Sequence, residues 1–585
     1  MKTIPSLFLK KANLYKDKPL FWYKVNNKWV SVSWKKSKEL VLNISNGLSN
    51  LGVNKNDKVS IISENSYKWC IADLAINTIG SVTVPGYTTS NEEELYHLIS
   101  HSETSVIFTN SNLFSKISKF VSQIKRIKLI ILFDNPNKKL MSNKSLKIIT
   151  FDDLNNISLK SKKTVNLKTY INTINENDLA CLIYTSGTSS LPKGVMLTHK
   201  SVVSNILGAA ELIKDLNENN HRFLSILPLS HAYEHTAGFL LPLLIGGEIY
   251  FNENRDHLIN DLQTSKPTLM IAVPRLYDVL YKKITSQILL QGKLSKYLFF
   301  KTIELGSKEF EKVKFTFFQQ IFNNLLSILV RKKIKNKFGG DLKTFISGGA
   351  ALNYKIGLFF NALGIKILQG YGQTECSPII STNPISKIKL KTVGPAIRGL
   401  EIKLSDDNEI LVKGTSLMNG YWKDKKSTNK TIINGWLHTG DIGHMDCDDY
   451  ITINGRKNEM IVNSGGENIS PVPIENRLLD SYEIEQVLVF GHNKPFLIAI
   501  IVLNDEVIIK YNANKTKLKQ IIKEIINNTN LELSQKNKIR KFFIAKHSFN
   551  IKNMQLTPTL KIKRNKIIKF YQSEIENLYK QSTIN

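Results

Sequence analysis

Strand-like and helix-like segments alternate along the first 180 residues, and this alternation limits the possible folds more than any other feature of the chain. Short β-branched runs have the pattern of buried strands: KVSIISENS, SVTVPGY, SVIFTN and KLIILFD. Between them, apolar residues recur at helical spacing in ELVLNISNGLSNLG and NEEELYHLISHS. Alternating strands and helices form largely parallel sheets covered by helices, so we predict layered α/β structure here.

The pattern changes twice further along the chain. Residues 278–338 are Lys-rich and helical in periodicity, and they carry the aromatic residues Tyr297, Phe299, Phe300, Phe310, Phe315, Phe317, Phe318 and Phe322. Two interpretations are open: an insertion that buries its own aromatic side chains, or an element that contacts a membrane surface or an apolar substrate. After residue 342, short strands and turns predict a β-rich subdomain, and residues 460–585 predict a small α+β domain.

A chain of 585 residues is too long for one compact core. The predicted fold class is therefore α/β: a large N-terminal domain of layered α/β subdomains plus a β-rich subdomain, followed by a small, mobile C-terminal α+β domain.

The net charge of +31 raises nucleic acid and anionic membranes as partners. Only ten residues are arginine, however, and the chain is also rich in Asn and Ile, a composition typical of AT-rich genomes. No basic motif with interleaved aromatic residues is present, so we expect no nucleic-acid binding. Peripheral contact with an anionic membrane stays open.

The four cysteines, Cys70, Cys181, Cys376 and Cys447, have no metal-ligand or paired spacing. This usage predicts neither a disulfide framework nor a zinc site and fits a reducing, cytoplasmic environment. No apolar segment approaches the ~20 residues that a membrane-spanning helix requires.

The segment YTSGTSSLPKGVMLTH, residues 184–199, places small hydroxyl residues, glycines and a lysine between two apolar segments. It is not a Walker A sequence, because five positions after Gly187 stands Pro192, and Lys193 is followed by Gly194. Backbone N–H groups, hydroxyls and a lysine nevertheless suit a polyphosphate. Taken alone, such a loop is more often a solvated turn.

The ordered pattern TSGTxxxPKG resembles the phosphate loop of the acyl-adenylate-forming (AMP-binding) superfamily: acyl-CoA synthetases, luciferases and adenylation domains. Six more segments resemble motifs of that family, in the family's order, over about 380 residues: LPLSHAYEHTAG, ISGGAAL, QGYGQTECSP, HTGD, GRKNE and LTPTLKIKR. The resemblance covers nearly the whole chain and is greatest to bacterial long-chain fatty acid–CoA ligases.

The resemblance implies an N-terminal AMP-binding domain in residues 1–455, a hinge at residues 456–459, and a C-terminal domain at residues 460–585 with the catalytic lysine. It implies ATP-dependent ligation of a fatty acid, long-chain in type, to coenzyme A through acyl-AMP, with Mg²⁺ as cofactor and with release of AMP and pyrophosphate. Two alternatives stay open: a fatty acyl-AMP ligase that loads an acyl carrier protein, and a non-catalytic membrane-associated relative.

This chemistry explains the residue types. A carboxylate must attack the α-phosphorus of ATP, and because two anions meet, cations and hydrogen-bond donors have to neutralise the developing charge. By resemblance, Lys561 would lie between the carboxylate and the α-phosphate, Tyr371 would stack on adenine, and Asp441 would accept hydrogen bonds from the ribose. His231 and Tyr233 would flank the acyl carboxylate.

The complete set of expected site residues follows from the same resemblance. Lys561, Thr188 and His231 are expected to be catalytic, and Glu375 is expected to hold Mg²⁺. The expected contacts to ATP and coenzyme A are Thr185, Ser186, Gly187, Thr188, Ser189, Lys193, Gly348, Gly349, Ala350, Gly370, Tyr371, Gly372, Thr374, Asp441, Arg456, Gly465 and Gly466. Two residues depart from the family pattern: Ser190 replaces a loop glycine, and Asn458 replaces the hinge Asp or Lys.

Overall fold

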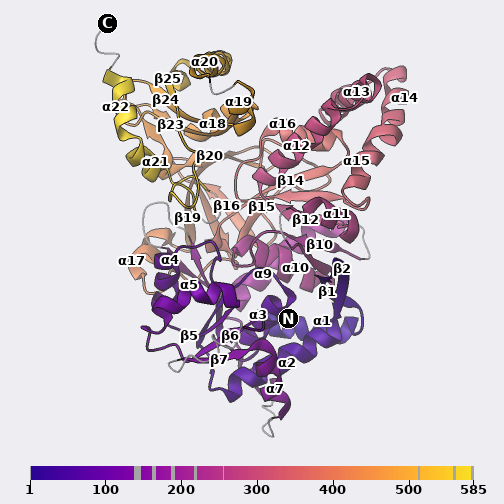
Figure 1. The fold of residues 1–585 in the computed structure, drawn as a ribbon, viewed down its shortest axis with the longest axis vertical. Coiled ribbons are helices and arrows are strands. Elements are labelled where there is room, and N and C mark those ends of the chain that lie inside the picture. The colour runs from indigo at the N-terminus through magenta and orange to yellow at the C-terminus, as the bar shows by residue number, and fades with distance from the viewer. Residues whose placement is uncertain are drawn as a thin grey trace.

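The computed structural model describes residues 2–136, 146–160, 167–185, 192–216, 220–253, 256–511, 514–557 and 561–580. Within these residues the strands form sheets of eight, seven, five, three and two strands. The two largest sheets and their helices make the body of the molecule, and the three-stranded sheet belongs to a smaller C-terminal unit (Figure 1).

The seven-stranded sheet comes from the region where strands and helices alternate in the sequence. Its order is β7-β6-β5-β3-β4-β8-β9, with parallel pairing throughout except for the antiparallel hairpin β8–β9. The strands are β3 (Lys58–Ile62), β4 (Val82–Pro85), β5 (Thr104–Thr109), β6 (Leu129–Leu132), β7 (Lys147–Thr150), β8 (Leu179–Thr185) and β9 (Lys193–Thr198). The intervening helices are α3 (Tyr67–Thr78), α4 (Glu92–His101), α5 (Ser111–Val121), α7 (Phe151–Lys160) and α8 (Leu167–Thr173), with α2 (Trp34–Asn50) before β3. The predicted strands and helices of this region are confirmed.

The eight-stranded sheet has the order β15-β14-β13-β12-β10-β11-β1-β2. Its central strands are parallel, and the edge strands β15 and β2 are antiparallel to their neighbours. The strands are β1 (Pro19–Val25), β2 (Lys28–Ser33), β10 (Arg222–Ser225), β11 (Glu248–Phe251), β12 (Leu269–Ala272), β13 (Thr344–Ser347), β14 (Lys366–Gly372) and β15 (Ile379–Thr382). Its helices include α1 (Ile4–Tyr15), α9 (His199–Ile213), α10 (Leu241–Ile245), α11 (Leu258–Ser265), α16 (Tyr354–Ala362) and the π-helix η2 (Glu234–Leu240).

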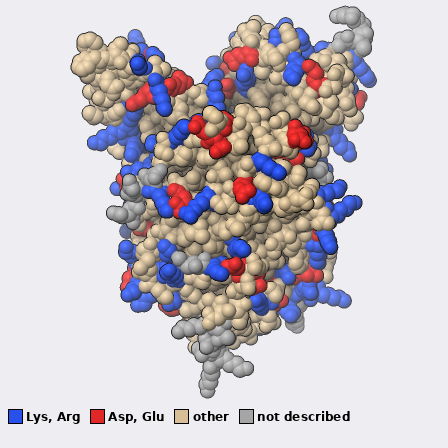
Figure 2. Space-filling view, turned by 180° about the vertical axis from the view of Figure 1, so that it is seen from behind, with Lys and Arg blue, Asp and Glu red and all other residues tan. Residues whose placement is uncertain are grey.

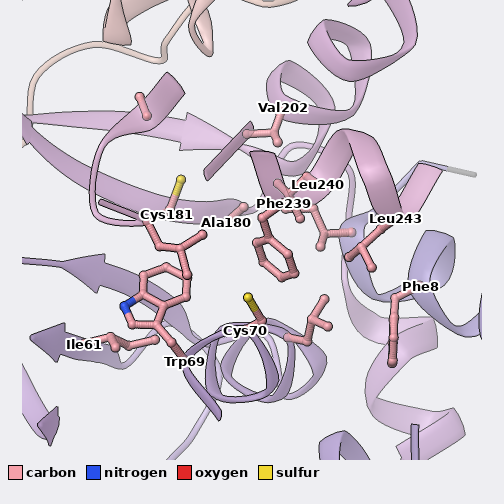
Figure 3. Close-up of a cluster of buried hydrophobic side chains, with 14 of the residues drawn as sticks. Phe8, Ile61, Trp69, Cys70, Ala180, Cys181, Val202, Phe239, Leu240 and Leu243 are labelled. Carbon is pink, nitrogen blue, oxygen red and sulfur yellow. The ribbon is translucent and has the colours of Figure 1, made fainter. Parts of the chain in front are cut away.

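The largest core joins these two layers (Figure 3). Trp69 and Cys70 of α3 face Phe239 of η2, with Cys181 of β8 on one side and Phe8 of α1 on the other. These side chains come from widely separated parts of the sequence, so their burial fixes the two sheets relative to each other. All four cysteines are free, and Cys447 alone is exposed.

The insertion at residues 278–338 is helical, as predicted, and forms an arm that projects from the body (Figure 1). It consists of α12 (Pro274–Leu289), α13 (Lys293–Phe310), α14 (Phe317–Leu326), the π-helical segment η3 (Ser327–Arg331) and α15 (Lys332–Lys337). Phe299 is buried, whereas Tyr297, Phe300, Phe317 and Phe318 are exposed. The interpretation that the insertion buries its own aromatic residues therefore holds for only part of the set.

The β-rich subdomain and the C-terminal unit complete the chain. The former contains β16 (Leu400–Leu404), β17 (Glu409–Gly414), α17 (Lys425–Thr431), β18 (Ile432–Ile433), β19 (Trp436–Met445) and β20 (Ile451–Arg456). The latter contains β21 (Ile461–Val462), β22 (Asn468–Ile469), α18 (Pro471–Leu479), β23 (Ile484–Phe490), β24 (Leu497–Leu503), α19 (Asp505–Lys510), α20 (Lys515–Leu531), β25 (Ile539–Ile544), α21 (Arg564–Phe570) and α22 (Gln572–Lys580). Short 3-10 turns are η1 (Lys214–Leu216), η4 (Thr374–Cys376), η5 (Lys457–Glu459) and η6 (Gln535–Asn537). None of the described helices has the length and apolar character to cross a membrane.

Candidate active site

Asp441 forms the centre of a polar network between β14, β19 and β20. Its buried carboxylate accepts hydrogen bonds from the Tyr371 hydroxyl (2.6 Å) and the Gln373 side-chain amide (2.6 Å). Arg456, the cross-strand neighbour of Asp441, places its Nε 3.0 Å from the other carboxylate oxygen. Burial and the Asp441 charge raise the pKa of Tyr371, so its hydroxyl remains a hydrogen-bond donor. The tyrosine expected at adenine and the aspartate expected at ribose are thus in direct contact.

The glycines beside Tyr371 are required by close backbone packing. A Cβ at Gly370 would lie 2.3 Å from Thr382 Oγ1, and one at Gly372 would lie 2.1 Å from the Pro378 carbonyl oxygen. Neither position has room for a side chain. The GYG pattern therefore also serves the packing of β14 against β15.

Glu375 lies in η4, directly after β14, and is held by a residue that the sequence reasoning did not identify. The Tyr421 hydroxyl donates to Glu375 Oε1 at 2.9 Å. Burial and the Glu375 charge raise the pKa of Tyr421, so this hydroxyl keeps its proton. The preceding residue of η4, Thr374, is half-buried. No pattern in the sequence pairs Tyr421 with Glu375.

Lys193 begins β9 and lies on the other side of Tyr421. Its Nζ is 5.0 Å from the centroid of the Tyr421 ring and 3.6 Å from the Asp424 carboxylate. Opposite Lys193 in the β8–β9 hairpin is Thr185, whose hydroxyl is 3.4 Å from the Lys193 carbonyl oxygen. The hairpin thus brings both ends of the proposed phosphate loop to Tyr421 and Glu375. The loop positions Ser186, Gly187, Thr188, Ser189 and Ser190 lie outside the described residues.

The glycine turn after β13 meets the segment that contains His231. A Cβ at Gly348 would lie 3.0 Å from the Tyr233 ring, and Gly349 has a positive φ of 86°, which favours glycine. Gly349 and the next residue, Ala350, are exposed. Tyr233 is anchored by its hydroxyl, which donates to the Ile346 carbonyl at 3.1 Å.

His231 is neutral at physiological pH and has a defined proton position. Burial, with a contribution from the positive charge of Lys561, lowers the pKa of His231 to about 4. Its Nδ1 accepts a hydrogen bond from the Tyr233 backbone N–H at 3.2 Å. The proton of the neutral ring is therefore on Nε2, which is left as a donor.

Lys561 comes from the C-terminal unit and reaches this network. Its own backbone is fixed to Thr557, with N–H to Oγ1 at 3.0 Å and carbonyl to N–H at 2.8 Å. Burial and the Arg456 guanidinium lower the pKa of Lys561, while the carboxylates of Asp441 and Glu375 act in the opposite direction. The charges of Arg456, Asp441 and Glu375 therefore all act on Lys561, which is exposed to solvent.

The hinge residues connect the two units through arginine and lysine contacts. Arg564 places both terminal nitrogens on the Glu475 carboxylate and its Nε 3.2 Å from Glu459. Such a planar, two-pronged contact explains an arginine in a lysine-rich chain. Lys457 lies 3.2 Å from Glu409, whereas Asn458 is exposed.

The turn expected to approach coenzyme A is not part of this network. Gly465 donates its N–H to Asn463 Oδ1 at 3.0 Å, Gly466 has a positive φ of 78°, and both glycines are exposed. The neighbouring Ser464 N–H donates to Lys494 of the same unit. Of the described residues expected in the site, the structure thus brings Tyr371 and Arg456 to Asp441 and leaves Gly465 and Gly466 at the surface of the C-terminal unit.

Two family models match successive parts of the chain, and both describe AMP-binding enzymes. A family model described as AMP-binding enzyme matches residues 8–422, and one described as AMP-binding enzyme C-terminal domain matches residues 458–583. The chain is 30% identical over 577 residues to a long-chain-fatty-acid–CoA ligase of Mycobacterium bovis, with 95% of this chain and 93% of the relative covered. It is 28% identical over 638 residues to a chloroplastic long-chain-fatty-acid–[acyl-carrier-protein] ligase of Arabidopsis thaliana, with 99% and 87% covered.

A solved structure shows the same fold. The chain superimposes on o-succinylbenzoate coenzyme A synthetase of Bacillus subtilis, determined in complex with ATP and magnesium ion, with a TM-score of 0.68 and 18% identity, covering 96% of this chain and 98% of that one. The predicted fold class and family are confirmed: this chain belongs to the AMP-binding enzyme family and has the fold of its adenylate-forming members.

Proposed function

We propose that this chain is an ATP-dependent ligase that joins a fatty acid, long-chain in type, to coenzyme A through an acyl-AMP intermediate. One observation carries the proposal: Lys561 of the C-terminal unit lies within electrostatic range of Asp441 and Glu375 of the N-terminal domain, of Arg456 at the hinge, and of His231. Carboxylate activation requires this combination of cations, a nucleoside-binding acid and a metal-binding acid in one place.

In the first step a carboxylate oxygen of the fatty acid attacks the α-phosphorus of ATP. The bond between the α-phosphorus and the bridging oxygen to the β-phosphate breaks, giving acyl-AMP and pyrophosphate. Lys561 supplies a mobile positive charge where the carboxylate and α-phosphate meet. His231, with its proton on Nε2, donates a hydrogen bond to the acyl carboxylate and orients it without adding charge.

The residues present fit a magnesium ion. Glu375 carries a half-exposed carboxylate, and Tyr421 engages one of its oxygens at 2.9 Å. Oxygen ligands of this kind suit Mg²⁺, which would neutralise charge on the ATP phosphates when bound. Lys193, 5.0 Å from the centroid of the same tyrosine ring, and Thr185 would contact the phosphates through the start and end of the loop.

In the second step the thiol of coenzyme A attacks the acyl carbonyl carbon. The carbon–oxygen bond to AMP breaks, AMP leaves, and the thiol proton is released to solvent. The exposed turn with Gly465 and Gly466 would approach the pantetheine after rotation of the C-terminal unit about residues 456–459. Asn458, which is exposed, tolerates the unusual backbone angles that such a rotation demands.

Two molecules are candidates for the acceptor of the acyl group. The Mycobacterium relative supports coenzyme A, and the Arabidopsis relative supports an acyl carrier protein as the alternative. A non-catalytic role is opposed by the presence of Lys193, Glu375, Asp441, Arg456 and Lys561. A cytoplasmic location completes the proposal and is supported by four free cysteines.

The experiment is a pyrophosphate-release assay with purified protein, Mg-ATP and fatty acids of increasing chain length. Each acid is tested with coenzyme A, with an acyl carrier protein, and without acceptor. We expect pyrophosphate release that depends on the acid, and acyl-CoA as the product. Release without any acyl-CoA, but with acylated carrier, would establish the alternative. No acyl-AMP and no pyrophosphate with any medium- or long-chain acid would overturn the proposal.

A further inference from the structure

The outer helix of the projecting arm has an apolar face without a protein partner in the described chain. Residues 315–330, FTFFQQIFNNLLSILV, include no charged side chain. At helical spacing along α14 and η3, the side chains are exposed as follows: Phe317 76%, Phe318 80%, Ile321 53%, Leu325 45% and Ile328 65%. We call these five residues the α14 face. Large apolar side chains exposed in one stripe mark an interaction surface.

The packing of the arm explains why this face is outermost. α13 packs on α16 so closely that a Cβ at Gly306 would lie 2.4 Å from the Ala362 carbonyl oxygen. α14 in turn places Asn323 and Leu326 inward, where Asn323 accepts a hydrogen bond from Arg331. At helical spacing, the exposed α14 face lies on the opposite side of the helix from these buried residues. The helix is thus anchored on one side and open on the other.

Positive charge surrounds the α14 face. Lys312 and Lys314 precede α14, Lys332 and Lys333 follow η3, and all four are exposed with no ion pair to any described residue. Residues 278–338 contain thirteen Lys and Arg against four Asp and Glu. This is roughly one basic residue in five, against about one in seven for the chain. Composition drift acts on the whole chain and does not account for this local excess.

We propose that the α14 face docks on a bilayer of anionic phospholipid. Phenylalanine and aliphatic side chains would enter the boundary between head groups and acyl chains, and the lysines at both ends of the helix would meet the lipid phosphates. In the space-filling view, the arm at the upper left ends in a mostly uncharged surface, with Lys and Arg and a group of Asp and Glu next to it (Figure 2). That is the distribution expected of an interfacial helix.

Charge favours a bilayer over a second copy of the chain. A two-fold symmetric contact through the α14 face would bring two arms of equal positive charge together. Lys312, Lys314, Lys332 and Lys333 would then repel their counterparts at the edge of the contact. An anionic bilayer satisfies both features at once, because it accepts apolar side chains and attracts the surrounding lysines.

The inference goes beyond the proposed function, since the α14 face contains none of the residues assigned to ATP, the carboxylate or coenzyme A. It also resolves the two interpretations of the insertion left open by its sequence. The inner aromatic residue Phe299 belongs to a protein core, and the outer ones, Phe317 and Phe318, are available to lipid.

The test is flotation of the full chain with vesicles of phosphatidylglycerol and phosphatidylcholine in equal parts, and with vesicles of phosphatidylcholine alone. We expect flotation with the mixed vesicles only, and loss of most of it when salt rises from about 0.1 M to about 0.5 M. Replacing Phe317, Phe318 and Ile321 by serine should reduce the bound fraction at least tenfold.

Two matched controls isolate the arm. Ile509, Leu531 and Phe570 of the C-terminal unit are exposed to a similar extent, and their replacement by serine should leave flotation unchanged. A charge variant with Lys312, Lys314 and Lys332 changed to glutamate should bind at least tenfold less at low salt. The same change at Lys515, Lys519 and Lys523 of α20 should have a much smaller effect. Thermal unfolding and circular dichroism verify that every variant is folded.

Each other outcome contradicts the proposal. Absence of flotation by the wild-type chain overturns it, and so does equal flotation of the serine variant of the α14 face, because binding would then lie elsewhere. Sedimentation velocity, which measures the oligomeric state, tests the remaining alternative, a second copy of the chain on the α14 face. If the wild-type chain is a dimer that the Phe317, Phe318 and Ile321 substitutions convert to a monomer, the occupant of the α14 face is a second copy and not lipid.

Discussion

Lys563 Nζ of the C-terminal unit lies 3.7 Å from the Glu94 carboxylate at the start of α4, and both side chains are largely buried. Two residues before Lys563 is Lys561, so this ion pair holds the lysine segment against the N-terminal domain. Lys355 with Asp480 (3.2 Å) is a further contact between the same two units. These two ion pairs hold the units in the described conformation, which is the one that we propose for adenylation.

Glu94→Gln should slow adenylation and spare the thiol step. Glutamine preserves the helix cap, in which Glu94 accepts from the Asn91 N–H, and removes the charge that attracts Lys563. A partly buried pair of this kind contributes about 1 kcal/mol, so pyrophosphate release should fall about fivefold. Acyl-CoA formation from preformed acyl-AMP should not change.

Glu93→Gln is the matched control, because the exposed Glu93 has no ion pair among the described residues. Equal loss in both variants, or equal loss in both half-reactions, would show that the Glu94–Lys563 pair does not position Lys561.

Lys561→Ala should lower the adenylation rate by about 10²–10³, the loss typical of removing one donor that stabilises a charged transition state. ATP binding, measured by calorimetry, should remain. Lys566→Ala, an exposed lysine in the same segment, is the control. An adenylation rate equal to that of the wild-type chain would remove Lys561 from the mechanism.

The pH profile of adenylation should report Lys561. Because the pKa of Lys561 lies below the ordinary lysine value of 10.5, its ammonium loses the proton at lower pH than that of a lysine side chain in water. Activity should therefore fall as pH rises through that lowered pKa, and Lys561→Arg should move this basic limb upward. His231, with a pKa of about 4, stays neutral above about pH 6 and should not contribute to the profile there. A basic limb that is unchanged in Lys561→Arg would contradict the assignment.

Asp441→Asn should weaken ATP binding more than Tyr371→Phe. The aspartate change removes the partner of Arg456 and the acceptor proposed for the ribose, and loss of hydrogen bonds to a charged group corresponds to about 10- to 100-fold in affinity. The tyrosine change removes one donor to Asp441 but keeps the ring proposed to stack on adenine. Calorimetric titration with ATP separates these effects. A weaker effect of Asp441→Asn than of Tyr371→Phe would reverse the two roles.

Tyr421→Phe should raise the Mg²⁺ concentration that gives half-maximal activity by about tenfold, because Glu375 would lose the donor that orients its carboxylate. Tyr450→Phe is the control, because this buried tyrosine donates its hydroxyl to the Lys387 carbonyl and not to Glu375. Equal Mg²⁺ dependence in the two variants would show that Tyr421 has no part in metal binding.

Much of the architecture follows from the sequence because hydrophobic periodicity is a local property. The strands β3 to β6 and the helices α2 and α4 lie where their patterns predict them. Of the described residues that the resemblance assigns to the site, Tyr371 and Arg456 both contact Asp441, and the charges of Asp441 and Arg456 act on Lys561; their roles stay a prediction. The residues at 186–190 stay a prediction, as does their role.

Other features depend on contacts between distant segments, which no local pattern encodes. Tyr421 holds Glu375 from 46 positions away, Gln373 reaches Asp441 across two subdomains, and Glu94 contacts a lysine near the C-terminus. The residue types of these side chains, and the residues next to them in the sequence, do not indicate a distant partner. The packing of the sheets determines which residues they contact.

The projecting arm separates most clearly the properties that the sequence determines from those that only the tertiary structure determines. Its helical character and its positive charge are determined by residues 278–338 themselves, because apolar spacing and lysine content are read along one segment. Whether a given phenylalanine is core or surface is decided only by tertiary packing. Phe299 is buried where α13 meets α16, whereas Phe317 and Phe318 project from a helix that has a neighbour on one side only. The physical reason is that burial depends on which element covers a side chain, and that element comes from elsewhere in the chain.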